Sequence, residues 1–104
     1  MLNTNLTKDA QKLVALLYKS YLERRKSGMA KSRAKFFEPN EIYALVDYPP
    51  EDVDETIREI KSVYPLKEDI IGNITLSDDM ISHMENRFKK GLIEVMNFLA
   101  QFIP

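Results

Sequence analysis

Apolar residues recur at helical spacing across residues 8–26. Six of them lie three, one, three, one and three positions apart, which places them on one face of an amphipathic helix: Ala10, Leu13, Val14, Leu17, Tyr18 and Tyr21. Thr7 is a favourable capping residue, and Asp9 in the first turn complements the positive end of the helix dipole. The sequence therefore predicts a first helix that ends at Lys26 or Ser27, just before Gly28.

Prolines divide the middle of the chain. Residues 29–37 show no clear period and predict a loop or a short edge strand. Pro39 suits the first position of a short second helix that ends at Asp47, because its fixed backbone angle is already helical. A residue before proline avoids helical angles, so Tyr48-Pro49-Pro50 predicts an extended turn, and Pro50 can open a third helix. The buried side of that helix is marked by Val53, Ile57 and Ile60.

After Tyr64-Pro65 the pattern changes to short runs rich in β-branched residues. Ile70-Ile71 and Ile74-Thr75-Leu76 flank Gly72-Asn73, an arrangement that predicts a β-hairpin. Its turn fits either Gly72-Asn73 or the earlier Glu68-Asp69, and the pattern leaves the register open.

A long apolar stripe follows Ser77, which caps a predicted helix over residues 77–104. Nine of the twelve residues from Leu92 to Ile103 are apolar, more than a single domain of this size needs to bury. We therefore expect a homodimer whose interface contains Phe88, Leu92, Val95, Met96, Leu99, Phe102 and Ile103.

This order of elements resembles the winged helix-turn-helix fold. The segment from Asn73 to Ile81 looks like the return strand of a wing that runs into a capped helix. Together with Met84-Glu85-Asn86-Arg87-Phe88, it is similar to small winged-helix-like proteins of bacteria and their mobile elements that have no assigned activity. The resemblance implies a mainly α (α+β) fold in one domain. Residues 1–76 would form a three-helix core with a small hairpin, and residues 77–104 a long C-terminal dimerisation helix.

Composition excludes most catalytic classes. The 104 residues include no cysteine and one histidine, so disulfide, zinc and thiol chemistry lack their usual groups. His83 is expected at a helix surface or an interface. The acids Asp47, Glu51, Asp52 and Asp54 lack the glycine and glutamate spacing of a calcium loop. We expect no enzyme activity, no cofactor and no metal.

The expected location is the cytoplasm. Residues 1–11 are polar and lack the features of a secretory signal. The apolar residues 92–103 cover about half the length that spans a bilayer, so no membrane partner is expected.

Charge is segregated along the chain. Residues 19–35 contain seven basic residues and one acid, a net +6, whereas residues 38–59 contain eight acids and one base, a net −7. By position, the helix of the fold that enters DNA is residues 51–62, and its net charge of −3 would repel phosphate. Any phosphate contacts would instead come from the basic segment: Arg24, Arg25, Lys26, Lys31, Arg33 and Lys35.

Three interpretations of the charged segments stay open. The basic residues contact nucleic-acid phosphate, the acidic residues 51–59 attract a basic protein, or both are solvated faces. The first hypothesis is a non-enzymatic binding or regulatory module, whose DNA-binding form would be a weak and salt-sensitive transcriptional regulator. The alternative is a protein-interaction adaptor on the same fold that does not bind DNA.

Overall fold

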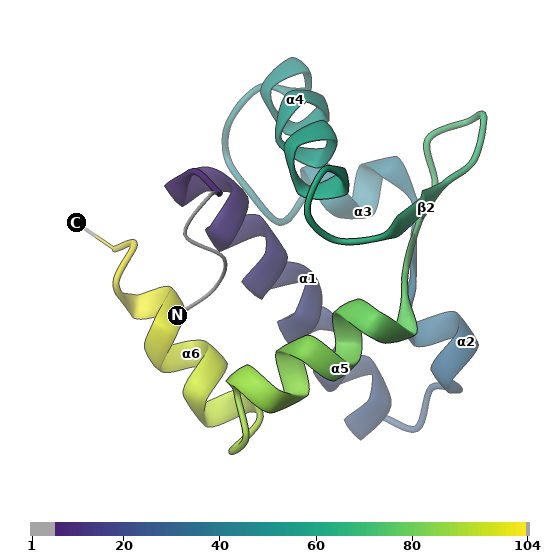
Figure 1. Cartoon of the computed structure of the whole chain (residues 1–104). Helices are drawn as coiled ribbons and strands as arrows, with labels where there is room; N and C mark the ends of the chain where they lie inside the picture. The colour runs from purple at the N-terminus through teal and green to yellow at the C-terminus, as the bar shows by residue number, and fades with distance from the viewer. Residues whose placement is uncertain (1–5, 104) are drawn as a thin grey trace.

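Helix α1 (Lys8–Lys26) is the central element of the computed structural model, which describes residues 6–103. It packs against α2 (Lys31–Ala34), α4 (Pro50–Lys61) and α6 (Leu92–Ala100), as Figure 1 shows. The six residues predicted to face the core are all at most 5% exposed. The predicted cap is confirmed as well, because the Thr7 hydroxyl accepts a hydrogen bond from the Ala10 amide at 3.2 Å.

The two proline-led helices begin where the sequence predicts. Pro39 opens α3 (Pro39–Tyr43), and Pro50 opens α4. The segment predicted as a loop or edge strand contains α2 and the two-residue strand β1 (Phe36–Phe37). Ala34 and Phe37 anchor this segment, since both side chains are almost completely buried.

A small antiparallel sheet completes this mainly helical fold. Strands β2 (Leu66–Glu68) and β3 (Ile74–Leu76) form the predicted hairpin, and β1 pairs with β3, giving the order β1-β3-β2. The register places Leu66 opposite Leu76 and Glu68 opposite Ile74. The prediction that Ile70-Ile71 form a strand was wrong, because both residues lie in the connecting loop, residues 69–73.

A single helix over residues 77–104 is not what the structure contains. Helix α5 (Asp78–Arg87) ends before Phe88, and α6 begins after Gly91, whose φ of 68° and ψ of −132° strongly favour glycine. Phe88 is buried between the rings of Tyr18 and Phe98, with centroids 6.2 and 5.7 Å away. The chain therefore folds back, and α6 packs on α1 of the same molecule. Within residues 6–103, no helix is long and apolar enough to cross a membrane.

The turn at Gly91 gives a stability prediction. Gly91→Ala should lower the free energy of unfolding by about 1–3 kcal/mol, because the added Cβ meets no neighbouring atom but forces alanine into a strained backbone conformation. Urea denaturation would measure the change. The neighbouring exposed Lys90→Ala is the control and should stay within about 0.5 kcal/mol of the unsubstituted chain. Equal stability of the two variants would contradict a strained turn.

Candidate functional site

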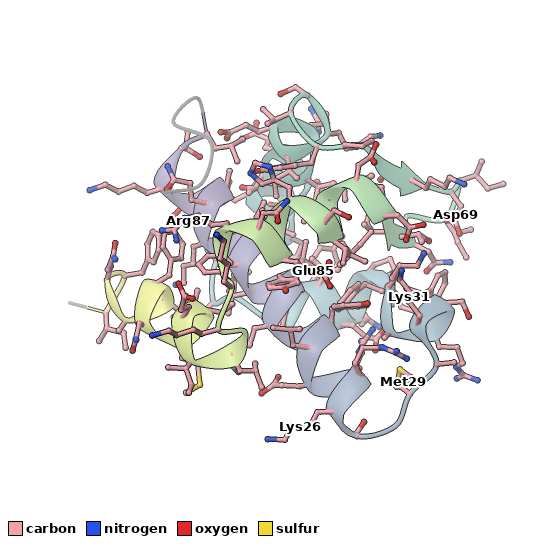
Figure 2. All side chains as sticks on the ribbon, turned by 60° about the horizontal axis from the view of Figure 1, so that its bottom comes forward. Lys26, Met29, Lys31, Asp69, Glu85 and Arg87 are labelled. Atoms are coloured by element: carbon pink, nitrogen blue, oxygen red, sulfur yellow. The ribbon has the colours of Figure 1, made fainter. Side chains whose placement is uncertain are left out.

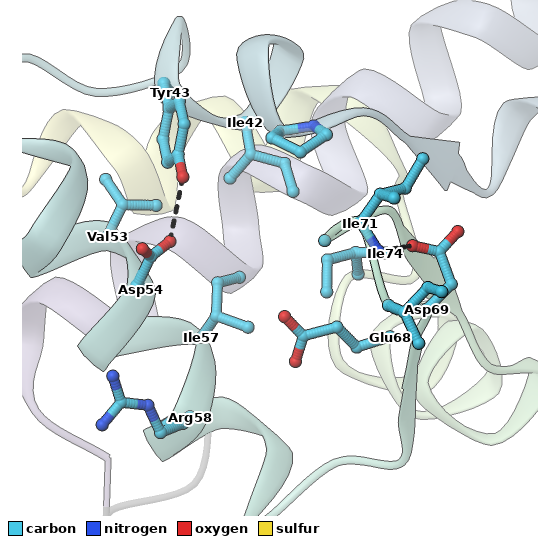
Figure 3. A pocket seen from close by; sticks show the side chains of 13 residues that line it. Ile42, Tyr43, Val53, Asp54, Ile57, Arg58, Glu68, Asp69, Ile71 and Ile74 are labelled. Carbon is cyan, nitrogen blue, oxygen red and sulfur yellow. Dashed lines mark hydrogen bonds between the residues drawn. The ribbon is translucent and has the colours of Figure 1, made fainter.

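A groove of about 450 Å³ lies between α4 and the loop of residues 69–73, and we call it the α4–loop groove. Its apolar lining includes the buried residues Ile42, Val53, Ile57 and Ile74. Figure 3 shows Asp54 and Arg58 on the α4 side and Glu68, Asp69 and Ile71 on the opposite side. The groove thus combines an apolar lining with one guanidinium and three carboxylates, of which Glu68 pairs with Lys61 at 2.9 Å.

Two isoleucines at the tip of the loop are unusually exposed. The side chains of Ile70 and Ile71 are 103% and 72% exposed, although isoleucine is among the residues most often buried. They lie directly after the acids Glu68 and Asp69. An apolar tip of this kind, attached to a folded domain, is characteristic of a contact surface.

Asp69 holds the loop in one shape. Its carboxylate accepts hydrogen bonds from the Ile71 amide at 3.1 Å, the Asn73 amide at 2.9 Å and the Asn73 side chain at 2.8 Å. Desolvation raises the pKa of Asp69, but these hydrogen bonds outweigh it, so the pKa lies below its ordinary value of 3.8. The isoleucines are therefore presented on an ordered loop.

Helix α4 exposes four of the five acids that the sequence assigns to it. Glu51, Asp52, Asp54 and Glu55 are exposed. The Tyr43 hydroxyl donates a hydrogen bond to Asp54 at 3.1 Å, and this bond raises the pKa of Tyr43 (Figure 3). Glu59 is used inside the fold, because its carboxylate accepts from the Thr7 amide at 2.6 Å and from the Thr7 hydroxyl at 2.9 Å.

The six basic residues predicted to contact phosphate differ in the contacts that their side chains make. The Arg24 guanidinium donates to the carbonyl oxygens of Ala34 at 3.3 Å and Phe36 at 2.7 Å, and it pairs with Glu41 at 2.8 Å. It also lies 4.1 Å from the centre of the Phe37 ring. Arg24 therefore joins the end of α1 to β1 and α3, which occupies its hydrogen-bonding groups.

The remaining cations are divided between internal and solvent-facing roles. Lys35 and Lys31 pair with Asp78 at 3.1 and 3.6 Å, and they lower the pKa of that carboxyl. Arg25 donates to the Met29 carbonyl at 3.1 Å. Within residues 6–103, Lys26 and Arg33 make no ion pair or hydrogen bond through their side chains, and Figure 2 shows Lys26 extending away from the end of α1. None of the six cations lines the α4–loop groove.

The predicted dimer residues are also separated by the turn at Gly91. Phe88 and Val95 are buried by their own chain, so they are unavailable to a second copy. Leu92, Leu99 and Phe102 are partly buried, whereas Met96 and Ile103 are 56% and 74% exposed. The homodimer stays a prediction. The surface that a second copy could contact contains fewer of the predicted residues than the sequence indicates.

The described part of the chain was also searched for a metal-binding cluster. Residues 6–103 contain no group of three histidine, cysteine or acidic side chains placed to hold a metal. His83 is exposed and contacts the ring of Tyr64 edge-on, with centroids 5.3 Å apart. No protein-family model, curated protein or solved structure matches the chain significantly.

The hydrogen bonds of Asp69 give a pH prediction. Since its pKa in the folded protein is below 3.8, the order of the loop should be complete above this value and be lost as the pH falls through the folded-state pKa. The NMR amide shifts of Ile71 and Asn73 should report this transition. In Asp69→Asn the same amides should show no such transition, because the side chain no longer titrates. A transition that persists in this variant would contradict the assignment of the pH dependence to the carboxyl of Asp69.

The contacts of Arg24 give a stability prediction. Arg24→Ala should lower the free energy of unfolding by about 1.5–3 kcal/mol, because it removes charge-assisted hydrogen bonds to two carbonyl oxygens. Lys26→Ala removes the same charge two residues away and should change stability by less than about 0.5 kcal/mol. Thermal or urea unfolding distinguishes the two variants. A similar loss of stability in both variants would mean that the positive charge at the end of α1, rather than the hydrogen bonds of Arg24, is responsible.

Proposed function

We propose that this chain is a non-enzymatic binding module with a winged-helix-like fold that recognises a segment of another protein. The order of elements supports the fold: a first helix, a one-turn helix, a short strand, two helices connected by residues 44–49, and a two-stranded hairpin. By position, α4 corresponds to the helix that enters DNA in DNA-binding members, and the loop of residues 69–73 corresponds to the wing. The α4–loop groove is therefore the expected contact face.

The charge of this face argues against a DNA duplex. Protein–DNA affinity depends on lysine and arginine neutralising phosphates, and exposed carboxylates add repulsion. The exposed side of α4 carries Glu51, Asp52, Asp54 and Glu55. Asp69 borders the other side of the groove together with Glu68, which pairs with Lys61 of α4 at 2.9 Å. Arg58 alone contributes positive charge to the groove lining.

The observation that carries the proposal is the pair of exposed isoleucines beside an acidic groove. Burial of apolar side chains supplies most of the affinity of protein interfaces, whereas complementary charges set orientation and association rate. Ile70 and Ile71 offer the apolar contact, and the carboxylates offer the charge. The matching partner is a segment with aliphatic side chains and neighbouring lysines or arginines.

Binding of model ligands tests this function. A fluorescently labelled amphipathic peptide of leucine and lysine should bind the full chain in an anisotropy titration, and salt should weaken the binding. A peptide of leucine and glutamate, and a short DNA duplex, should not bind. Asp54→Lys and Ile71→Ser should each weaken binding of the leucine–lysine peptide about tenfold, which corresponds to ~1.4 kcal/mol.

Two variants outside the groove are matched controls. Glu85→Lys makes the same charge change on the exposed surface of α5, and Ile93→Ser shortens another exposed isoleucine. Both should bind the leucine–lysine peptide as the unsubstituted chain does. The proposal fails if the controls weaken binding as much as the groove variants, or if the DNA duplex binds more tightly than the peptide.

A further inference from the structure

The two edges of the three-stranded sheet differ in how their backbone groups are used. In antiparallel pairing, every second residue of a strand bonds to one neighbouring strand, and the residues between them point to the other side. On β1, the Lys35 carbonyl accepts from the Leu76 amide at 3.0 Å, so the backbone groups of Phe36 point away from β3. The Arg24 guanidinium donates to the Phe36 carbonyl at 2.7 Å. A side chain of the same molecule therefore covers the carbonyl at this edge.

The edge formed by β2 has no such cover. The Asp69 amide donates to the Asn73 carbonyl at 3.1 Å, and Lys67 is opposite Thr75 in the same register. By the alternation of antiparallel pairing, Lys67 bonds to β3, and the N–H and C=O of Glu68 point away from the sheet. Within the described part of the chain, these two groups make no hydrogen bond beyond the sheet. Because Glu68 is also exposed, the edge of β2 is open to another chain.

This open edge borders the α4–loop groove. The side chain of Glu68 lines the groove and faces Ile57 and Arg58 of α4 (Figure 3). A residue paired with Glu68 in an added antiparallel strand places its side chain on the same face of the sheet as the Glu68 side chain. That side chain would therefore enter the groove, whose volume of about 450 Å³ lies in the range of ligand-binding clefts.

We infer that the segment bound by the α4–loop face is extended and adds to β2 as a fourth, antiparallel strand of the sheet. This inference rests on the proposed function and specifies the kind of partner. The backbone of Glu68 exchanges two hydrogen bonds with the segment, and alternate side chains of the segment enter the groove. A peptide backbone is the matching occupant, because it carries a donor and an acceptor at the spacing of the open edge.

The two faces of the added strand define which sequences fit. Every second residue of the segment faces the groove and should be aliphatic, because the groove contains the buried side chain of Ile57. The residues between them lie on the other face, beside the exposed Lys67, where a lysine would be repelled. Glu68 already pairs with Lys61 at 2.9 Å, so its carboxylate is not needed as a charge partner. Basic residues of the partner therefore belong outside the paired positions.

A designed peptide tests the inference in an anisotropy titration with the full chain. The probe has leucine at every second position, threonine between the leucines and a lysine at each end; at about seven residues it is too short to form a stable helix. It should bind at least about fivefold more tightly than a peptide of the same composition whose leucines are adjacent. Methylation of the leucine amides should weaken binding about tenfold, whereas methylation of the threonine amides should change it less than about twofold, because only the leucine amides face β2.

Substitutions of Glu68 test the same hydrogen bond from the side of the protein. Glu68→Pro removes the outward amide, and proline is tolerated on an edge strand at such a position, so the chain should fold and bind the alternating peptide about fivefold more weakly. Glu68→Ala is the matched control, because it also loses the pair with Lys61 but keeps the amide, and it should bind within about twofold of the unsubstituted chain. Hydrogen exchange followed by NMR should show the Glu68 amide protected only in the complex and the Lys67 amide protected throughout.

The inference is overturned if the two methylated peptides bind equally, or if the Glu68 amide stays unprotected in the complex; neither measurement depends on the proline variant. It is also overturned if the chain self-associates and Glu68→Pro abolishes this association, since a second copy would then cover the edge. The proposed function would survive these results if the leucine–lysine peptide still bound in a manner that depends on Asp54 and Ile71. Failure of every leucine-containing peptide to bind would reject both proposals.

Discussion

The burial of α1 on several sides is the constraint on which the rest of the structure depends. One part of the helix presents Tyr18, whose ring stacks against Phe88 with centroids 6.2 Å apart, and Phe88 in turn contacts Phe98 of α6. At the N-terminal end of the helix, Thr7 is hydrogen-bonded to Glu59 of α4. The same helix thus positions α6 and also α4, which forms one side of the α4–loop groove.

Features set by local chemistry could be predicted from the sequence. Thr7 and Ser77 accept hydrogen bonds from amides three residues later, and Pro39 and Pro50 occupy the first positions of their helices. Each of these preferences depends on a few neighbouring residues. The core face of α1 was predictable for a similar reason, because one amphipathic period extends over the whole helix.

Features set by contacts between distant residues could not be predicted in this way. The apolar stripe continues across the turn at Gly91 because α5 and α6 both bury apolar residues in the same core, so the pattern resembles that of one helix. Arg24 and Lys26 are equally basic in sequence, but the carbonyl oxygens of Ala34 and Phe36 engage only Arg24. Ile70 and Ile71 have strong β propensity, yet Leu66–Glu68 is the segment that pairs with β3. The signal for a turn was present in Asp69 and Gly72-Asn73, residues typical of turns.

The folded arrangement changes what the charge segregation can do. Along the chain, a basic segment is separated from an acidic one. In the fold, however, the basic side chains of Arg24, Lys31 and Lys35 form ion pairs within the chain. Asp54 of α4 and Asp69 of the loop remain exposed around the apolar α4–loop groove, whereas Glu68 pairs with Lys61. Exposed charge pairs contribute little free energy by themselves. Beside apolar surface that becomes buried, however, the same charges determine which surfaces can approach each other and in which orientation.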